Sequence, residues 1–429
     1  MGGRRETLLK VLQVLAWVLL TITFCKHVVY YPLFREGAWG VDYGKHYVAA
    51  REVLAGRSPF VGENYLGFNY PQFTAWLYLF LAAFSLEGAE KVWNLCNALF
   101  VIAAFFTIVA FYRPKPRESA DALSACDAQA GRSRGALDPG VALWVRDHWA
   151  SVSALLYAGF APWFMDFHCG NIEPLNLILI VAFGAALIRG ADGVAGVVLA
   201  MACLVKILPV FFLLPLAMAR RWRVVSVCMA AMAVYASILF ASELWRPGDG
   251  WWRWEVSLFT DTLPRVAFEY RDLSRSLVAI AARYFSPLLW DSEPAFNLAA
   301  RGLGLAILAS YVCVLIAARR FLRRSWRDGV AFTALAIVIL SPLIEYHHLV
   351  WSIPAYLFLV VDYVEGRVRH GFFALAAGLW GAIFLCRYWT DLGPSGAVHP
   401  LDIATLLLVV LWVAMAVRIV RMRGESGIA

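Results

Sequence analysis

Helix-length apolar runs, repeated along the chain and separated by short polar segments, constrain the fold more than any other feature of this sequence. A membrane-spanning helix needs roughly 20 predominantly apolar residues. Of the 429 residues, 61% are apolar and 16% are charged, whereas soluble domains average about 45–50% apolar and about 25% charged. The sequence therefore predicts an all-α polytopic integral membrane protein. It excludes a soluble enzyme, a nucleic-acid-binding domain and a disordered scaffold.

The apolar runs predict about 10–13 transmembrane helices in a single membrane domain over residues 1–429. The first span covers 8–30, and later spans centre on 90–112, 148–167, 174–189, 224–243, 296–318, 329–343, 349–363, 371–387 and 400–418. Two regions do not fit one ordinary crossing. Residues 71–86 are short for a span, and 194–219 predict a broken or hairpin element. Irregular backbone at membrane depth is tolerated only where it is buried in protein or lines a cavity.

Arginine clusters in short loops predict the orientation, because such loops stay in the cytoplasm. The net charge of +8 comes from 38 basic and 30 acidic residues, and we assign it to cytoplasmic loops rather than to nucleic-acid binding. The loops 113–147 and 319–328 are therefore predicted to be cytoplasmic, the first as a flexible connector. The loops 31–70 and 244–275 are predicted to face outward from a cytoplasmic (inner) membrane.

The first outer loop predicts an amphipathic helix that starts near Asp42 and ends before Gly56. On such a helix Asp42 faces Lys45 and His46 at spacings of three and four residues. Spacing alone favours an N-capping role for Asp42, and a carboxylate beside two basic groups is the functional alternative.

Other polar residues lie in short outer turns or at helix ends. Asn171 belongs to a polar turn over 166–174, for which structural capping and function are equally supported. Lys206 stands in an apolar setting, so its ammonium must pair, reach the interface or bind an anion. Adjacent His347 and His348 end a span and cannot both point the same way, so one can face a cavity and bind a phosphate or a metal. The metal is disfavoured because no third ligand lies nearby in the sequence.

The outer loop 244–275 combines several tryptophans with Arg271. Indole rings at a membrane interface are usually anchors, and stacking on a sugar ring is the alternative. Tyr70 precedes a proline at the predicted start of the next helix, which means little by itself.

Several sequence signals of cofactor binding are absent from the chain. It has no Asp-x-Asp, no P-loop, no Gly-x-Gly-x-x-Gly and no metal-type spacing of Cys and His. We therefore expect no cofactor and no metal site. A divalent cation remains possible, although no ligand set indicates one.

Short motifs along residues 10–360, among them the Asp42-Tyr43 pattern, Val205-Lys206-x-x-Pro209 and His347-His348, resemble those of glycosyltransferase family 87, the polyprenol-phosphate-mannose-dependent transferases of the GT-C class. The pattern D-Y-x-x-x-Y-x-A-A-x-x-x-L-x-G-x-x-P-F begins at Asp42, and F-x-Y-P follows at 68–71. Further matches fall in order: Gly170-Asn171, Val205-Lys206-x-x-Pro209, the Arg-Arg-Trp-Arg at 220–223, and the run from Ser341 through His347-His348 to Trp351. The chain departs from the family pattern at Gln72 and over 170–173, which leaves the sugar and the acceptor open.

The resemblance implies a GT-C fold and a donor carried on a polyprenyl phosphate, with the active site facing the extracytoplasmic side. It implies transfer with inversion of a hexose, mannose foremost, to a lipid or glycan acceptor among the membrane lipids. Asp42 would be the general base. Candidates for binding the donor phosphate or the substrate are His347, His348, Lys206, Lys45, Arg271, Tyr70 and Asn171.

Two other functions remain open from the sequence. A lipid-linked glycan or small-solute transporter would carry charged residues deep within its spans. A glycan polymerase or ligase would place its main active-site loop late in the chain. The concentration of polar residues at outer helix ends, beginning with Asp42, favours the glycosyltransferase.

Overall fold

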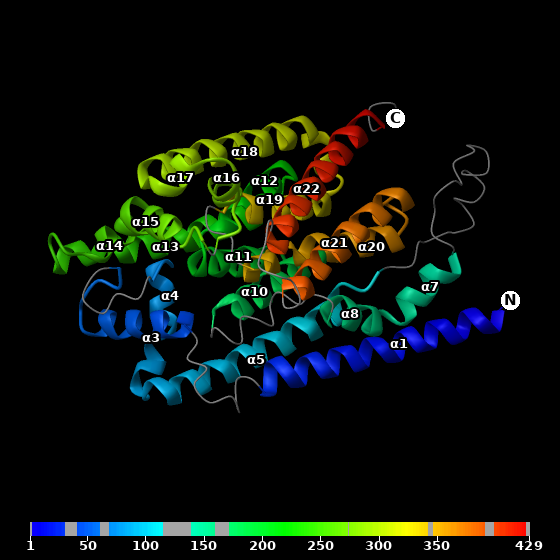
Figure 1. Cartoon of the computed structure of the whole chain (residues 1–429), viewed down its shortest axis with the longest axis horizontal. Coiled ribbons are helices and arrows are strands. Elements are labelled where there is room, and N and C mark those ends of the chain that lie inside the picture. Colours follow the sequence, from blue (N-terminus) through cyan, green and yellow to red (C-terminus); the bar gives the residue numbers. More distant parts are fainter. Residues whose placement is uncertain are drawn as a thin grey trace.

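The computed structural model describes residues 2–30, 41–60, 68–114, 139–158, 171–272, 274–341, 346–390 and 399–425. Within these ranges every regular element is a helix, which confirms the predicted all-α class (Figure 1). The elements up to residue 205 are α1 (Gly2–Phe24), η1 (Cys25–Tyr30), α3 (Val41–Leu54), α4 (Gln72–Leu77), η2 (Leu79–Ala83), α5 (Leu86–Phe111), α7 (Pro139–Asp147), α8 (Trp149–Ala158), α10 (Glu173–Ile188) and α11 (Asp192–Val205).

The remaining elements continue to the C-terminal end of the described chain. They are η4 (Leu208–Phe212), α12 (Leu213–Met218), α13 (Trp222–Trp245), α14 (Trp251–Ser257), η5 (Leu258–Thr262), α15 (Leu263–Glu269), α16 (Leu277–Phe285), α17 (Pro287–Asp291), α18 (Glu293–Leu322), α19 (Trp326–Leu340), η6 (Tyr346–Ser352), α20 (Ile353–Val364), α21 (His370–Thr390) and α22 (Pro400–Glu425).

Four helices in the described part are long and apolar enough to cross a membrane. They are α5, α13, α18 and the stretch Asp402–Met422 of α22. Shorter apolar helices accompany them, among them α10, α11 and the segment His348–Val364. The chain is thus a polytopic membrane protein, and the number of crossings stays a prediction.

Both irregular regions predicted from the sequence are broken in the structure. Residues 71–86 form the two short helices α4 and η2 instead of one span. In the second region α11 ends at Val205, Lys206 is extended with φ −152° and ψ 121°, and η4 and α12 follow. Pro209 cannot donate an amide hydrogen bond, and it is fixed early in η4 where none is needed. The break predicted within 194–219 is confirmed, and residues 71–86, predicted to be short for a span, form two short helices.

The connector expected over 113–147 is partly helical, which corrects the sequence prediction. Helix α7 occupies Pro139–Asp147, and residues 115–138 lie outside the described part of the chain. The Nε group of Arg113 donates to the carbonyl of Arg146 at 3.2 Å, so the two ends of the connector lie together. The helix forms because Leu143, Trp144 and Val145 extend an apolar run into the predicted loop.

The core lies around α19, which is buried from Asp328 to Ile339. A helix that is apolar on all sides belongs at the centre of a bundle. Helices α18, α20 and α22 and the short helix α12 all pack against α19. Helix α20 is likewise buried through most of its length, so the two form the centre on which the other helices are arranged.

A charged network lies where α19 begins and α20 ends. We call it the Arg327 network; its members are Arg327, Arg367, Arg418, Asp328, Asp362 and Glu365. Arg327 contacts Asp362 and Glu365 at 3.0 Å each. Arg367 contacts Asp362 at 2.8 Å, and Arg418 contacts Asp328 at 3.1 Å. Three guanidinium groups thus face three carboxylates.

The molecule has two distinct ends along its long axis. Figure 1 shows α3, α4, α14 and α15 gathered at one end, and α7 with both chain termini at the other. Helix α3 appears where the sequence predicted it, and Gly56 beyond it has a φ of +71°. This is the left-handed conformation that favours glycine after a helix. The Gly56 carbonyl accepts a hydrogen bond from Arg246 at 2.7 Å, which fastens the end of α3 to the end of α13.

Candidate active site

Lys206 is held at the break between α11 and η4, where the last carbonyls of α11 favour a cation. Its ammonium forms an ion pair with the carboxylate of Glu173. The Lys206 side chain is 14% exposed, whereas the Glu173 side chain is fully buried. Lys206 therefore forms an ion pair, which is one of the three arrangements that the sequence allowed. A small part of its side chain remains accessible.

Glu173 is the first residue of α10, where a helix favours a negative charge. Its Oε2 atom accepts a hydrogen bond from the amide of Asn176 at 3.1 Å. Its Oε1 atom lies 3.7 Å from Nε2 of His348, whose side chain is 8% exposed. One carboxylate thus gathers an ammonium, an amide and an imidazole from three segments of the chain.

Tyr70 and Asn171 complete this group. The Tyr70 hydroxyl donates to Oδ1 of Asn171 at 3.2 Å, and the Lys206 ammonium lies 5.5 Å from the centre of the Tyr70 ring. The Asn171 carbonyl accepts from the amide of Asn97 at 3.0 Å. We call Tyr70, Asn171, Glu173, Lys206 and His348 the Lys206 cluster. Four of these five are residues that the sequence nominated.

Helix α3 reaches the cluster through His46. The His46 ring lies 4.7 Å from the Tyr70 ring and stacks on Tyr78 at 4.6 Å. Both ring nitrogens are buried and have no hydrogen-bond partner among the described residues. Burial, helped by the ammonium groups of Lys45 and Lys206, lowers the pKa of His46 to about 3. His46 is therefore neutral at physiological pH.

Asp42 is the second residue of α3, one helical turn before His46. Residues four apart on a helix share a face and lie about 6 Å apart along the axis. The backbone therefore places Asp42 next to the group that packs on Tyr70. The side chains of Asp42 and His347 lie outside the described part, and the role of each stays a prediction.

Lys45 and Arg271 point to a neighbouring region. The Lys45 ammonium lies 5.1 Å from the centre of the Tyr270 ring. The Arg271 guanidinium packs on the rings of Phe268 and Trp290 at 4.1 Å and 4.8 Å and donates to the Phe268 carbonyl at 2.9 Å. Lys45 therefore lies directly before His46 on α3 and contacts Tyr270. Arg271 is held between aromatic rings and does not contact the Lys206 cluster through any of these interactions.

Sequence reasoning also missed a half-buried carboxylate, Glu255 of α14. Its Oε2 atom accepts the backbone amide of Gln72 at 2.9 Å, and the Tyr235 hydroxyl accepts the amide of Phe73 at 3.0 Å. These two side chains satisfy the first free amides of α4, which has no cap of its own. Burial raises the pKa of Glu255 to about 7, against the opposing effect of the Gln72 amide.

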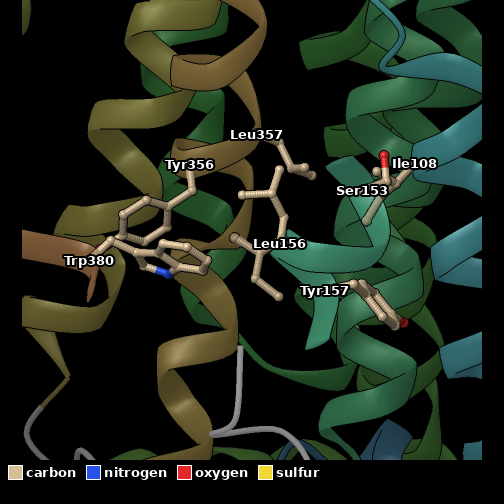
Figure 2. Close-up of a pocket in the computed structure, with 8 residues that line it drawn as sticks. Ile108, Ser153, Leu156, Tyr157, Tyr356, Leu357 and Trp380 are labelled. Atoms are coloured by element: carbon tan, nitrogen blue, oxygen red, sulfur yellow. The ribbon is translucent and has the colours of Figure 1, made fainter. Parts of the chain in front are cut away.

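The cavities do not coincide with the Lys206 cluster. Figure 2 shows one lined by Ser153, Leu156, Tyr157, Tyr356 and Trp380, between α5, α8, α20 and α21. Its volume of about 20 Å³ is room for a single water. A wider depression of about 560 Å³ opens beside α13 and α14, where Trp252, Arg253 and Asp261 line it.

No group of three or more His, Cys, Asp or Glu that could hold a metal ion occurs among the described residues. The described residues of the site offer an ammonium, two imidazoles, a carboxylate, and hydroxyl and amide groups. Such a set can bind an anionic phosphate and sugar hydroxyls. Metal dependence stays a prediction.

Comparison with protein families matches residues 68–345 to glycosyltransferase family 87. The chain belongs to this family, which confirms the resemblance seen in its motifs, and the protein is a membrane glycosyltransferase. A comparison with curated proteins finds no match. The matched range includes Tyr70, Asn171, Glu173 and Lys206 but ends before His348 and begins after α3. The geometry around His46 and His348 is thus an independent reason to include these segments in the site.

Proposed function

We propose that the protein transfers a hexose, mannose foremost, from a polyprenyl-phosphate donor to a lipid or glycan acceptor at the extracytoplasmic side of the cytoplasmic membrane. The observation that carries the proposal is the Lys206 cluster. It joins a lysine ammonium and an imidazole at a broken helix, next to the helix that carries Asp42. A lipid-borne donor requires a phosphate site near one membrane face, and broken helix ends supply one.

The reaction follows from these groups. The Asp42 carboxylate accepts the proton of the acceptor hydroxyl, whose oxygen attacks the anomeric carbon with inversion. The bond from that carbon to the phosphate oxygen breaks, and polyprenyl phosphate leaves with both electrons. Lys206 and His348 stabilise the charge that develops on the phosphate, and His347 is a further candidate. Since phosphate is already a good leaving group, no second carboxylic acid is needed, unlike in a glycosidase.

The arrangement of basic residues supports the proposed orientation. Helices α10, α11, α19 and α20 each have one end at or near the Lys206 cluster. Their opposite ends carry Arg189, Arg221, Arg327 and Arg367. Because basic residues favour the cytoplasmic side, the cluster faces the other side.

Transfer by purified protein in liposomes tests the proposal. The donor is radiolabelled polyprenyl-phosphate mannose, and a membrane lipid extract supplies the acceptor. Asp42→Asn is expected to lower transfer by about 100-fold or more, because the attacking hydroxyl loses its base. The matched control is Glu52→Gln on the same helix, where Glu52 pairs with exposed Arg57 at 2.9 Å.

Wild-type transfer that survives in Glu52→Gln and is lost in Asp42→Asn supports both the donor class and the base. Wild-type rates in Asp42→Asn would show that another group accepts the proton. Absence of transfer from mannose, glucose, galactose and arabinose donors alike would overturn the proposed donor class.

A further inference from the structure

A buried carboxylate occupies the centre of the proposed phosphate site. Glu173 is fully buried, pairs with the Lys206 ammonium, and approaches the His348 imidazole to 3.7 Å. The base of the proposed mechanism is Asp42, so Glu173 has no part in the proton transfer. Burying a carboxylate is costly unless it is paired, and here it neutralises a cation that phosphate binding needs.

The net charge of the Lys206 cluster limits how much negative charge a bound phosphate can carry. The Lys206 ammonium and the Glu173 carboxylate cancel, and the His348 imidazole adds one positive charge when it is protonated. His46, the next ring outward, adds none at physiological pH, because burial holds its pKa near about 3. The net charge of the cluster is thus zero or one positive.

Donor and product of the proposed reaction differ in charge at the phosphate. A sugar linked through phosphate to a polyprenyl chain is a phosphodiester with one negative charge. The polyprenyl phosphate that leaves is a monoester, whose second ionisation has a pKa of about 6. Near neutral pH the product therefore carries almost two negative charges.

We propose that Glu173 is a specificity-determining residue that makes the site accept the singly charged donor phosphate and release the doubly charged product phosphate. The proposal rests on the proposed function. A phosphate oxygen bonded to the Lys206 ammonium lies about 5 Å from the carboxylate bonded to the same ammonium, since each hydrogen bond spans roughly 2.8 Å. At that distance and in a buried setting, the carboxylate cancels most of the attraction that the Lys206 ammonium offers to an added negative charge. The larger cost of desolvating a dianion then makes the doubly charged phosphate bind more weakly than the singly charged one.

Binding of two lipids that carry a phosphate but no sugar isolates this effect from catalysis. The probes are a short-chain polyprenyl phosphate and its methyl phosphodiester, which share the chain and differ in phosphate charge. Their dissociation constants are measured at about pH 8, where the monoester is a dianion. Wild type is expected to bind the diester more tightly than the monoester, although the monoester carries more charge.

Glu173→Gln is expected to shift the ratio of the two dissociation constants by about tenfold in favour of the monoester. Glu173→Asp keeps the charge and is expected to keep the wild-type ratio. The matched control is Asp192→Asn, because Asp192 forms an ion pair with Arg221 at the beginning of α11, whereas Lys206 directly follows the other end of that helix. It is expected to leave the ratio unchanged.

A ratio in Glu173→Gln within about twofold of wild type, with both lipids bound, would overturn the role of Glu173. Tighter wild-type binding of the monoester would overturn it too, even if Glu173→Gln failed to fold. Transfer activity measured in parallel separates the two proposals. Active wild type with an unchanged ratio contradicts only the role of Glu173, whereas a wild type that binds neither lipid contradicts the donor class and the inference together.

Discussion

The Lys206 cluster and the Arg327 network lie at opposite ends of the central helices and treat their charges differently. In the Arg327 network three guanidinium groups meet three carboxylates through several ion pairs of 2.8–3.1 Å. In the Lys206 cluster a single carboxylate contacts both an ammonium and an imidazole. Beside it, both nitrogens of His46 and both amide atoms of Gln72 are buried without hydrogen-bond partners in the described part.

The contrast separates a structural network from a binding site. Buried polar groups in folded proteins are almost always satisfied, so a saturated network stabilises one arrangement of helices. Unsatisfied groups in a buried setting are retained where a ligand or water completes them. By this criterion the Arg327 network holds the bundle together, whereas the unpaired groups of His46 and Gln72 beside the Lys206 cluster support the proposal that a substrate binds there.

The largest expected effect is on activity at the Lys206 cluster. Lys206→Met is expected to lower kcat/KM for sugar transfer by about 100-fold, because the leaving phosphate loses its cation. The measurement is steady-state transfer in liposomes at matched amounts of folded protein. Lys206→Met combined with Glu173→Gln, which removes the unpaired carboxylate, separates lost catalysis from lost folding. Recovery of wild-type activity in this double variant would contradict a role for Lys206 in the reaction.

The opposite pattern is expected at the Arg327 network. Arg327→Met leaves Asp362 and Glu365 short of a partner, so it is expected to destabilise the fold by about 3 kcal/mol. Thermal unfolding followed by tryptophan fluorescence in detergent measures the loss. The kcat/KM of the protein that remains folded is expected to stay within about twofold of wild type, since the site is remote. A large fall in kcat/KM with unchanged stability would show that the Arg327 network contributes to activity and not to stability, which contradicts its structural role.

Acid sensitivity is expected from His46, at the edge of the Lys206 cluster. Its pKa falls from 6.5 to about 3 on folding, chiefly through burial. The unfolded chain therefore binds the extra proton as pH drops below 6.5, and stability falls by roughly 3 kcal/mol by about pH 4. His46→Phe fills a similar volume between Tyr70 and Tyr78 and is expected to remove that share of the slope. Equal acid sensitivity of wild type and variant would show that His46 is already charged in the fold.

A smaller and opposite dependence is expected from Glu255. Burial raises its pKa from 4.5 to about 7, so the folded state holds the proton more tightly. Stability is then greatest below about pH 4.5 and falls by about 2–3 kcal/mol between about pH 5 and about pH 8. Glu255→Gln is expected to abolish this loss, and unfolding midpoints from about pH 5 to about pH 8 measure it. A variant that loses as much stability as wild type over this interval would place the titration elsewhere.

Much of the local structure follows from the sequence, because the signals are local. The helix that begins beside Asp42 and ends before Gly56, and the break at Lys206, were both predicted from short-range patterns. The meeting of Tyr70 with Lys206, 136 positions later in the printed sequence, depends on how distant helices pack. No spacing rule within one helix predicts such a contact. The sequence could therefore identify most residues of the cluster, but it could not show that they lie together.

Glu173 was within reach of sequence reasoning and was missed. Helices α10 and α11 are joined by a tight turn at Gly190, which has a φ of +71°. Glu173 and Lys206 lie at almost equal separations before and after this glycine. Two antiparallel helices of equal length bring such residues together, so a carboxylate and an ammonium at the open end of the pair predict a buried ion pair.

The most direct test of the site is a cryo-electron microscopy structure of the protein with polyprenyl phosphate bound. The account predicts the phosphate within hydrogen-bond distance of the Lys206 ammonium and the His348 imidazole, with Glu173 on the far side of the ammonium. Helix α3 is expected to place the Asp42 carboxylate on the side of the phosphate where the sugar would lie. A phosphate bound instead by Arg271, or at the Arg327 network, would contradict the account.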